Sequence, residues 1–342
     1  MKDILNKATR IIAFTLCATT LFFFLSSVCE RKTYDGAWNY MGKMNEFYSL
    51  EENTLDYIAV GSSHMYCTLN PLEVWNKSGA AGFVLATQQQ PLQASYHYIK
   101  EAFKTQSPKY VILEGYMIYG ESTYDSAVLY DAIDPLKFSF NKVQMINNLV
   151  EYEDRPNYYF NILKYHSRWN TVTANEINRI LEQPQDIYKG FVALDGNYSG
   201  YNLIPDYDNT NDIELSEFNT QVLNDIYELV TDNGAALILM FGPYDTNSVE
   251  LCEKIKAEIK WAEEKGITVL DYCEMLNDIN IDPTNDYYDA GHLDISGAKK
   301  VSIHFASYLK ENKLKKNNRI THDQWQMDYN TYSENFSNEI YS

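Results

Sequence analysis

Residues 56–66 read DYIAVGSSHMY, and this stretch decides the fold. Residues 57–60 form a short apolar run, which is typical of a strand buried on both faces of a parallel sheet. Gly61 gives the backbone the freedom to turn sharply where that strand ends. The turn therefore presents Ser62, Ser63 and His64 at the carboxyl end of a strand, the edge of an open α/β sheet where ligands bind.

The same alternation of strand and helix signals continues along the chain. Short apolar runs predict strands, and segments with helical periodicity predict helices between them. The strands are expected at residues 57–60, 83–86, 110–113, 235–241 and 267–270, and the helices at 71–76, 92–103, 218–230 and 249–264. This order predicts an α/β fold with a doubly wound, five-stranded parallel sheet.

A second polar stretch lies near the other end of the chain and reads YYDAGHLDISGAK (residues 287–299). Asp289 and His292 are three residues apart, just before a helix that we expect Asp294 to cap. A neutral imidazole can take the proton of a serine hydroxyl, and a carboxylate can hold the other ring N–H. His292 is thus a candidate base, oriented by Asp289, for activating Ser63.

Gly61-Ser62-Ser63 after the first strand, with Asp289 and His292 before the last helix, resembles the SGNH (GDSL-type) hydrolase superfamily. The resemblance implies a flavodoxin-like three-layer α/β/α sandwich with Ser63 as nucleophile. The Gly-Ser-Ser variant is similar to the membrane-anchored, cell-envelope branch that includes the D-alanyl transfer protein of lipoteichoic acid synthesis and relatives of the alginate O-acetylation proteins.

Each half of this pattern also has a structural explanation. A serine after a strand-ending glycine is common, and an Asp-x-x-His before a helix is often only a cap. Their joint occurrence at the first strand and the last helix favours serine chemistry. The absence of a Gly-x-Ser-x-Gly elbow around Ser63 disfavours the α/β-hydrolase family.

The expected oxyanion hole departs from the superfamily pattern, which has a glycine after the second strand and an asparagine after the third. Gln89 takes the glycine position, so the resemblance implies backbone N–H donors from Ser63 and Gln89. Tyr116 and its neighbours replace the asparagine, and one lost donor can cost ~3 kcal/mol of transition-state stabilisation. His64 and Tyr116 are candidate substrate contacts. Either the segment after the third strand supplies a replacement donor, such as a tyrosine, or the reaction is slower and more specialised.

A long interruption of the α/β pattern, at about residues 119–212, leaves from the end of the third strand. We therefore expect a mostly helical cap over the catalytic edge, with helices near residues 143–150, 158–165 and 174–181. Arg168 and Trp169 are candidate contacts for an anionic group and a sugar ring. Packing of the cap onto the sheet is the competing interpretation for these side chains.

Composition restricts the partners. The 342 residues carry a formal net charge of −19, which argues against binding nucleic acid through general electrostatics. Five cysteines show no metal-ligand spacing, and Cys252 and Cys273 are either paired or free. Asp289, His292 and a nearby aspartate are the only candidate metal ligands, and we expect neither a metal nor a cofactor.

The N-terminus is expected to anchor the chain in a membrane. Residues 1–10 carry three positive side chains and residues 11–28 carry no charge, enough to cross a hydrocarbon core of about 30 Å. A cleaved signal peptide or a lipoprotein signal is the alternative. The expected organisation is a cytoplasmic N-terminus (1–10), a transmembrane anchor (11–29), a connector (30–54), a catalytic domain (55–312) and a polar tail (313–342).

The expected anchor and the resemblance to envelope acylation proteins together imply an O-acyltransferase-like enzyme on the outer membrane face, although the triad itself does not distinguish transfer from hydrolysis. It would pass an acetyl or D-alanyl group through a Ser63 ester to an envelope or secreted polysaccharide, with the acyl donor delivered by a membrane-bound acyltransferase. A polysaccharide O-acetyl esterase is the alternative with the same residues. An inactive scaffold or glycan-binding member is the third, since the asparagine donor is missing.

Overall fold

The computed structural model describes residues 2–30, 39–118, 124–196, 198, 205–244, 248–312 and 322–336. Its centre is a five-stranded, fully parallel sheet in the order β2-β1-β3-β4-β5. The strands are β1 (Tyr57–Gly61), β2 (Gly82–Ala86), β3 (Tyr110–Glu114), β4 (Ala236–Phe241) and β5 (Thr268–Asp271). The predicted five-stranded α/β fold is confirmed, and its strand order is flavodoxin-like.

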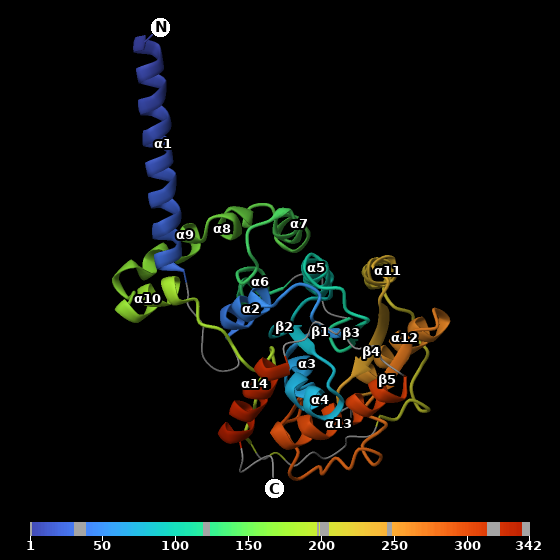
Figure 1. Cartoon of the computed structure of the whole chain (residues 1–342). Helices are drawn as coiled ribbons and strands as arrows, with labels where there is room; N and C mark the ends of the chain where they lie inside the picture. Colours follow the sequence, from blue (N-terminus) through green and yellow to red (C-terminus); the bar gives the residue numbers. More distant parts are fainter. Residues whose placement is uncertain are drawn as a thin grey trace.

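Helices cover both faces of the sheet, which gives three layers (Figure 1). Alternate strand residues face opposite layers: Ile58 and Val60 join one core cluster, Tyr57 and Ala59 the other. The first layer contains α2 (Tyr40–Ser49), α5 (Leu92–Ala102), α11 (Glu217–Asp232) and α12 (Val249–Glu264); the second contains α3 (Ser63–Thr68), α4 (Pro71–Ser78) and α13 (Ile295–Glu311).

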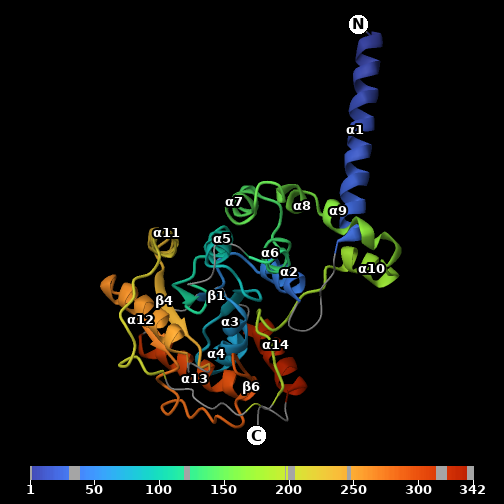
Figure 2. The same cartoon turned by 180° about the vertical axis from the view of Figure 1, so that it is seen from behind.

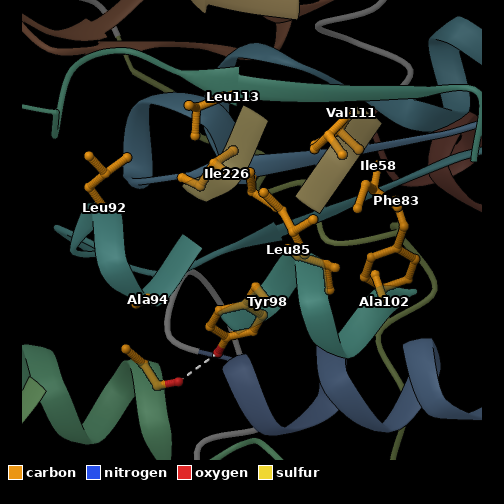
Figure 3. Close-up of a cluster of buried hydrophobic side chains, with 14 of the residues drawn as sticks. Ile58, Phe83, Leu85, Leu92, Ala94, Tyr98, Ala102, Val111, Leu113 and Ile226 are labelled. Carbon is orange, nitrogen blue, oxygen red and sulfur yellow. Dashed lines mark hydrogen bonds between the residues drawn. The ribbon is translucent and has the colours of Figure 1, made fainter. Parts of the chain in front are cut away.

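Figure 3 shows how the first layer packs onto the sheet. Side chains from three strands meet α5 and α11, all of them nearly or fully buried. Tyr98 of α5 points away from the strands, and its hydroxyl donates to the backbone oxygen of Ala132 at 2.8 Å. Because α5 buries residues on two sides, a further helical tier must cover its outer side.

That tier is the insertion after β3, and its position differs from our prediction. Its described helices are α6 (Ser126–Ile133), α7 (Phe140–Leu149), α8 (Arg155–Tyr159), α9 (Asn161–Tyr165), the 3₁₀ helix η2 (His166–Asn170) and α10 (Ala174–Glu182). α7 packs on α5, while α9, η2 and α10 pack on α1 (Lys2–Cys29). These helices lie on the outer side of α5 and beside α1, and none of them lies over the carboxyl edge of the sheet (Figures 1 and 2). The prediction of a helical cap over that edge is therefore wrong.

The reason lies in apolar side chains that the insertion and α5 share. Leu129, Ile133, Met145 and Ile146 are buried in the same cluster as Tyr98. Two of the expected helices are present, but the one expected at residues 158–165 is broken into α8 and α9 at Phe160, whose backbone leaves the helical region (φ −131°, ψ 88°). Periodicity predicted the helices without predicting their docking surface.

The chain returns from the insertion along the open edge of β2. Val84 donates its backbone N–H to the oxygen of Lys189 at 2.9 Å, so this segment covers an edge that would otherwise expose unpaired backbone groups. Gly190 adopts φ +84°, and a Cβ there would lie 2.0 Å from the Val84 oxygen. The segment then passes α3 and α13, where Ile295 donates to the Leu194 oxygen.

The predicted tail contains a docked helix. α14 (His322–Asn335) packs on α4, with Trp325 and Tyr332 buried. Lys189 is buried between Glu46 and Asp328, and it pairs with both carboxylates. Two aromatic anchors and an ion pair therefore fix a segment that its composition marked as polar; residues 313–321 and 337–342 lie outside the described part.

Candidate active site

Ser63 is the first residue of α3, at the sharp turn that follows β1. Ser62 precedes α3 as its N-cap, and its hydroxyl accepts the backbone N–H of His64 at 3.3 Å. A Cβ at Gly61 would lie 2.4 Å from the Cβ of Glu114 on the neighbouring strand, so only glycine fits where the two strands approach. The turn lies between β1 and β3, where the direction of strand winding reverses and ligands bind in such sheets.

His292 and Asp289 reach the same turn from a two-stranded ribbon before α13. The ribbon pairs β6 (Tyr287–Asp289) with β7 (His292–Leu293), and Asp294 caps α13 by accepting the N–H of Gly297 at 2.9 Å. Nε2 of His292 lies 2.8 Å from the hydroxyl of Ser63, and Nδ1 lies 2.8 Å from a carboxylate oxygen of Asp289.

These contacts decide the proton positions that the array supports. A carboxylate only accepts, so Nδ1 of His292 carries the proton that it donates to Asp289. Nε2 is then an acceptor for the hydroxyl of Ser63. The same Asp289 oxygen accepts the backbone N–H of Gly291 at 2.8 Å, which fixes the carboxylate. The arrangement is that of a nucleophile, a base and a group that orients the base.

A buried carboxyl group that the sequence patterns did not indicate, that of Glu114, holds the serine turn in place. Glu114 ends β3 with its side chain buried, and its Oε2 accepts both the backbone N–H of Ser62 at 2.9 Å and the hydroxyl of Ser62 at 2.8 Å. Its Oε1 accepts the backbone N–H of Tyr116. Glu114 therefore fixes the turn after β1 and the turn after β3 together. The available signal was a charged residue directly after the apolar run of a central strand.

Burial raises the pKa of Glu114 to about 7, although its hydrogen bonds from Ser62 and Tyr116 act in the opposite direction. A second carboxyl lies close by: Glu258 of α12 is fully buried, and an added Cβ on Gly115 would approach its Oε2 to 2.7 Å. Burial and the charge of Glu114 raise the pKa of Glu258 well above its usual range. Glu258 is therefore neutral, and it adds no second negative charge beside Glu114.

Aromatic rings form a wall beside the catalytic array. His64 is buried, with its ring centroid 3.8 Å from that of Tyr116, 5.0 Å from Tyr244 and 5.1 Å from His292, to which it is perpendicular. Burial, together with the charge of His292, lowers the pKa of His64 to about 3. His64 is thus a neutral ring at physiological pH, and Tyr244, which sequence patterns did not single out, completes the wall.

The remaining candidates are Gln89, the expected second oxyanion donor, and the residues Arg168 and Trp169. Gln89, in the turn after β2, adopts φ +48°, the left-handed conformation that favours glycine and that fits the glycine position assigned to it. Its backbone N–H donates no hydrogen bond within the described part of the chain. The structure brings Ser63, His64, Tyr116, Asp289 and His292 together around one turn.

Arg168 and Trp169 lie elsewhere. Both belong to η2, and Arg168 donates to the backbone oxygens of Cys29 and Glu30 at the end of α1 and pairs with Glu176. Trp169 is exposed beside them. Neither contacts the serine turn, so their expected role as substrate contacts is not supported. All five cysteines, each within the described residues, are free thiols.

Comparisons with known proteins find similarity to solved structures. No protein family matches the sequence, and no curated protein matches it. Among solved structures, the chain is similar to a lipolytic protein of the G-D-S-L family from Desulfitobacterium hafniense DCB-2, with 13% identity over 75% of this chain and 99% of that chain and a TM-score of 0.40. Since that score is low, the fold assignment rests on the strand order, and the site rests on its side-chain geometry.

Proposed function

We propose that this protein is a membrane-anchored serine acyltransferase that acts through a Ser63 acyl-enzyme. The observation that carries the proposal is the continuous chain of contacts from Ser63 to His292 to Asp289, each 2.8 Å long. A serine within hydrogen-bond reach of an oriented imidazole is the arrangement that activates a hydroxyl for attack on an acyl carbon.

In the proposed first half-reaction, Ser63 attacks the acyl carbon of a donor ester or thioester. Its proton passes to His292, whose positive charge Asp289 stabilises. The backbone N–H groups of Ser63 and Gln89 are the proposed donors to the tetrahedral oxyanion. As the donor bond breaks, His292 gives the proton to the leaving group, and the acyl group remains on Ser63.

The second half-reaction transfers that acyl group to a hydroxyl of a cell-envelope or secreted polysaccharide. His292 takes the proton of the acceptor hydroxyl, the new ester bond forms, and the bond to Ser63 breaks as the proton returns to the serine. The donor group is proposed to be acetyl or D-alanyl, supplied by a membrane-bound acyltransferase. Water as acceptor makes the same site an esterase, which is the alternative.

A retained anchor supports transfer at the membrane surface. α1 is long and apolar enough to cross a membrane between Leu5 and Cys29, a property that a signal sequence also has. Its last turn, however, is built into the folded body: Ser26 and Cys29 are buried, and the Ser26 hydroxyl accepts the backbone N–H of Ile162 at 3.0 Å. Cleavage near residue 28 would remove part of that packing, so we propose that α1 stays attached.

The contact between Ser63 and His292 also counts against an inactive scaffold. To separate a transferase from an esterase, polysaccharide acylation is measured in cells that carry Ser63→Ala. Loss of acyl groups supports transfer, whereas their accumulation supports the esterase. Ser307→Ala removes a hydroxyl from α13, where it bonds only within the helix, and is the matched control.

A further inference from the structure

The end of α1 is enclosed by the insertion, while residues 5–25 of that helix are exposed. Arg168 donates to the backbone oxygens of Cys29 at 3.1 Å and of Glu30 at 2.8 Å, which satisfies carbonyl groups at the helix terminus. Asn161 of α9 bonds to the carboxylate of Glu30. These polar contacts fix α9, η2 and α10 rigidly around the point where α1 leaves the folded body.

The contact between α1 and α9 gives the depth at which α9 lies. The charge-free residues 11–28 span about 27 Å as a helix, which is close to the thickness of a hydrocarbon core. Phe22 lies six residues before Val28, or about 9 Å along the helix. Its ring centroid is 5.8 Å from that of Phe160, at the start of α9. If α1 crosses a membrane, α9 therefore lies at the boundary of headgroups and acyl chains.

Large apolar side chains of α9, η2 and α10 are exposed around the end of α1. We call them the juxtamembrane patch, and its members are Phe160, Leu163, Trp169, Ile177 and Leu181. Trp169 is 75% exposed and Leu181 is 83% exposed. Exposure of such large apolar side chains to water is unfavourable. Ile177 and Leu181 are four residues apart on α10, so they share one side of that helix.

The arrangement of the whole body agrees with this placement. Both views show α7, α8 and α9 as the tier of the body on the side from which α1 projects (Figures 1 and 2). Both views also show α3 and α13, which flank Ser63, across the sheet from α5 and that tier (Figures 1 and 2). A body resting on this tier keeps the serine turn away from the bilayer.

We propose that the juxtamembrane patch lies in the interface of the same membrane that α1 crosses, with lipid headgroups and upper acyl chains as its occupant. This inference rests on the proposed retention of α1. Amphipathic helices that lie in such an interface bury their apolar side by about 5–10 Å, which agrees with the 9 Å inferred from Phe22. Because the chain is strongly acidic, zwitterionic rather than anionic lipid is the expected surface.

Trp169 offers a direct test, since the other tryptophans in the described residues are buried. The full-length protein is reconstituted into phosphatidylcholine vesicles whose acyl chains are brominated close to the headgroup. The emission of Trp169 is isolated as the difference between wild type and Trp169→Phe. We expect this emission to be shifted to the blue, quenched by the brominated lipid, and protected from aqueous acrylamide.

A variant pair tests the patch itself. Leu163→Gln with Leu181→Gln is expected to raise the acrylamide quenching of Trp169 at least twofold, whereas Val249→Gln with Met327→Gln, exposed on α12 and α14, leaves it unchanged. Emission of Trp169 that acrylamide quenches freely in pure lipid vesicles overturns the proposal, and a protein partner then becomes the occupant.

Two further readouts separate this inference from the proposals beneath it. Resistance to alkaline extraction and an intact N-terminus by mass spectrometry report whether α1 is retained, and acylation of Ser63 reports the chemistry. A retained anchor with Trp169 in water contradicts the patch alone. Loss of the anchor, with release of the body into the aqueous phase, overturns both the patch and the retention on which it depends.

Discussion

The substitution Glu114→Gln separates the positioning of the nucleophile from the stability of the fold. Glu114 accepts three hydrogen bonds, two from Ser62 and one from the backbone of Tyr116. Glutamine has the same shape but only one accepting oxygen, so its NH₂ group must face at least one of these donors. A buried donor left without an acceptor costs about 1–3 kcal/mol.

If that cost is expressed as misplacement of the serine turn, turnover falls roughly 10- to 100-fold, because about 1.4 kcal/mol corresponds to a factor of ten. KM should change little, since Glu114 is buried beneath the turn and is screened from substrate by Ser62. The assay is steady-state hydrolysis of p-nitrophenyl acetate by the full-length protein in detergent, with Glu263→Gln at the exposed end of α12 as the matched control.

The same substitution should reduce the loss of unfolding free energy that wild type shows at high pH. The pKa of Glu114 is raised from 4.5 to about 7 by burial, so the folded chain binds more protons than the unfolded chain between these values. This group therefore contributes stability that is fully present below pH 4.5 and is lost as the pH rises through 7, a change of roughly 3 kcal/mol. Glutamine does not ionise, so the variant should lose about 3 kcal/mol less than wild type.

Urea unfolding of both proteins at pH 4.5 and pH 8 measures this difference. A variant that is slower in turnover yet relatively more stable at pH 8 is the expected combination. Turnover within twofold of wild type would refute the positioning role of Glu114. Equal losses of stability in both proteins between the two pH values would refute the raised pKa.

Three further substitutions test other parts of the structure. Asp289→Asn should lower turnover by roughly 10²–10⁴-fold without unfolding the protein, because an amide no longer fixes the histidine tautomer; a loss below tenfold in the same ester assay would contradict that role. Gly190→Ala should cost more unfolding free energy than Gly234→Ala, since both need positive φ but only the first brings a Cβ against the oxygen of Val84, and equal urea midpoints would show that the β2 edge does not require this contact. Lys189→Met should cost about 3–5 kcal/mol because it leaves two buried carboxylates without a cation, and limited proteolysis should then release α14 first; unchanged protection of α14 would argue against its attachment by this ion pair.

The sheet could be predicted from the sequence because each of its strands is short, apolar and bounded by turn signals. Because β1 and β3 are parallel neighbours, the turn after β1, which leads to Ser63, lies beside the turn after β3. α12 was predicted at its observed bounds because a glycine, Gly266, follows the end of its apolar periodicity.

The parts that the sequence did not predict depend on surfaces between elements. The outer side of α5, with Tyr98 at its centre, determines where the insertion docks, and the helical periodicity of the insertion does not contain that information. Glu114 ends a strand, so its position in the sequence indicates only a strand boundary. Its role becomes clear from the three hydrogen-bond donors around it in the structure. α14 was hidden by a polar composition, although its Trp325 packs against α4 through Trp75.

Mass spectrometry of the full-length protein after brief incubation with p-nitrophenyl acetate tests directly whether Ser63 is the nucleophile. We expect an acetyl adduct on the peptide that contains Ser63, absent from Ser63→Ala and retained in Ser307→Ala. Absence of both adduct and turnover from the wild-type protein, or an adduct that persists in Ser63→Ala, would contradict the claim that Ser63 is the nucleophile.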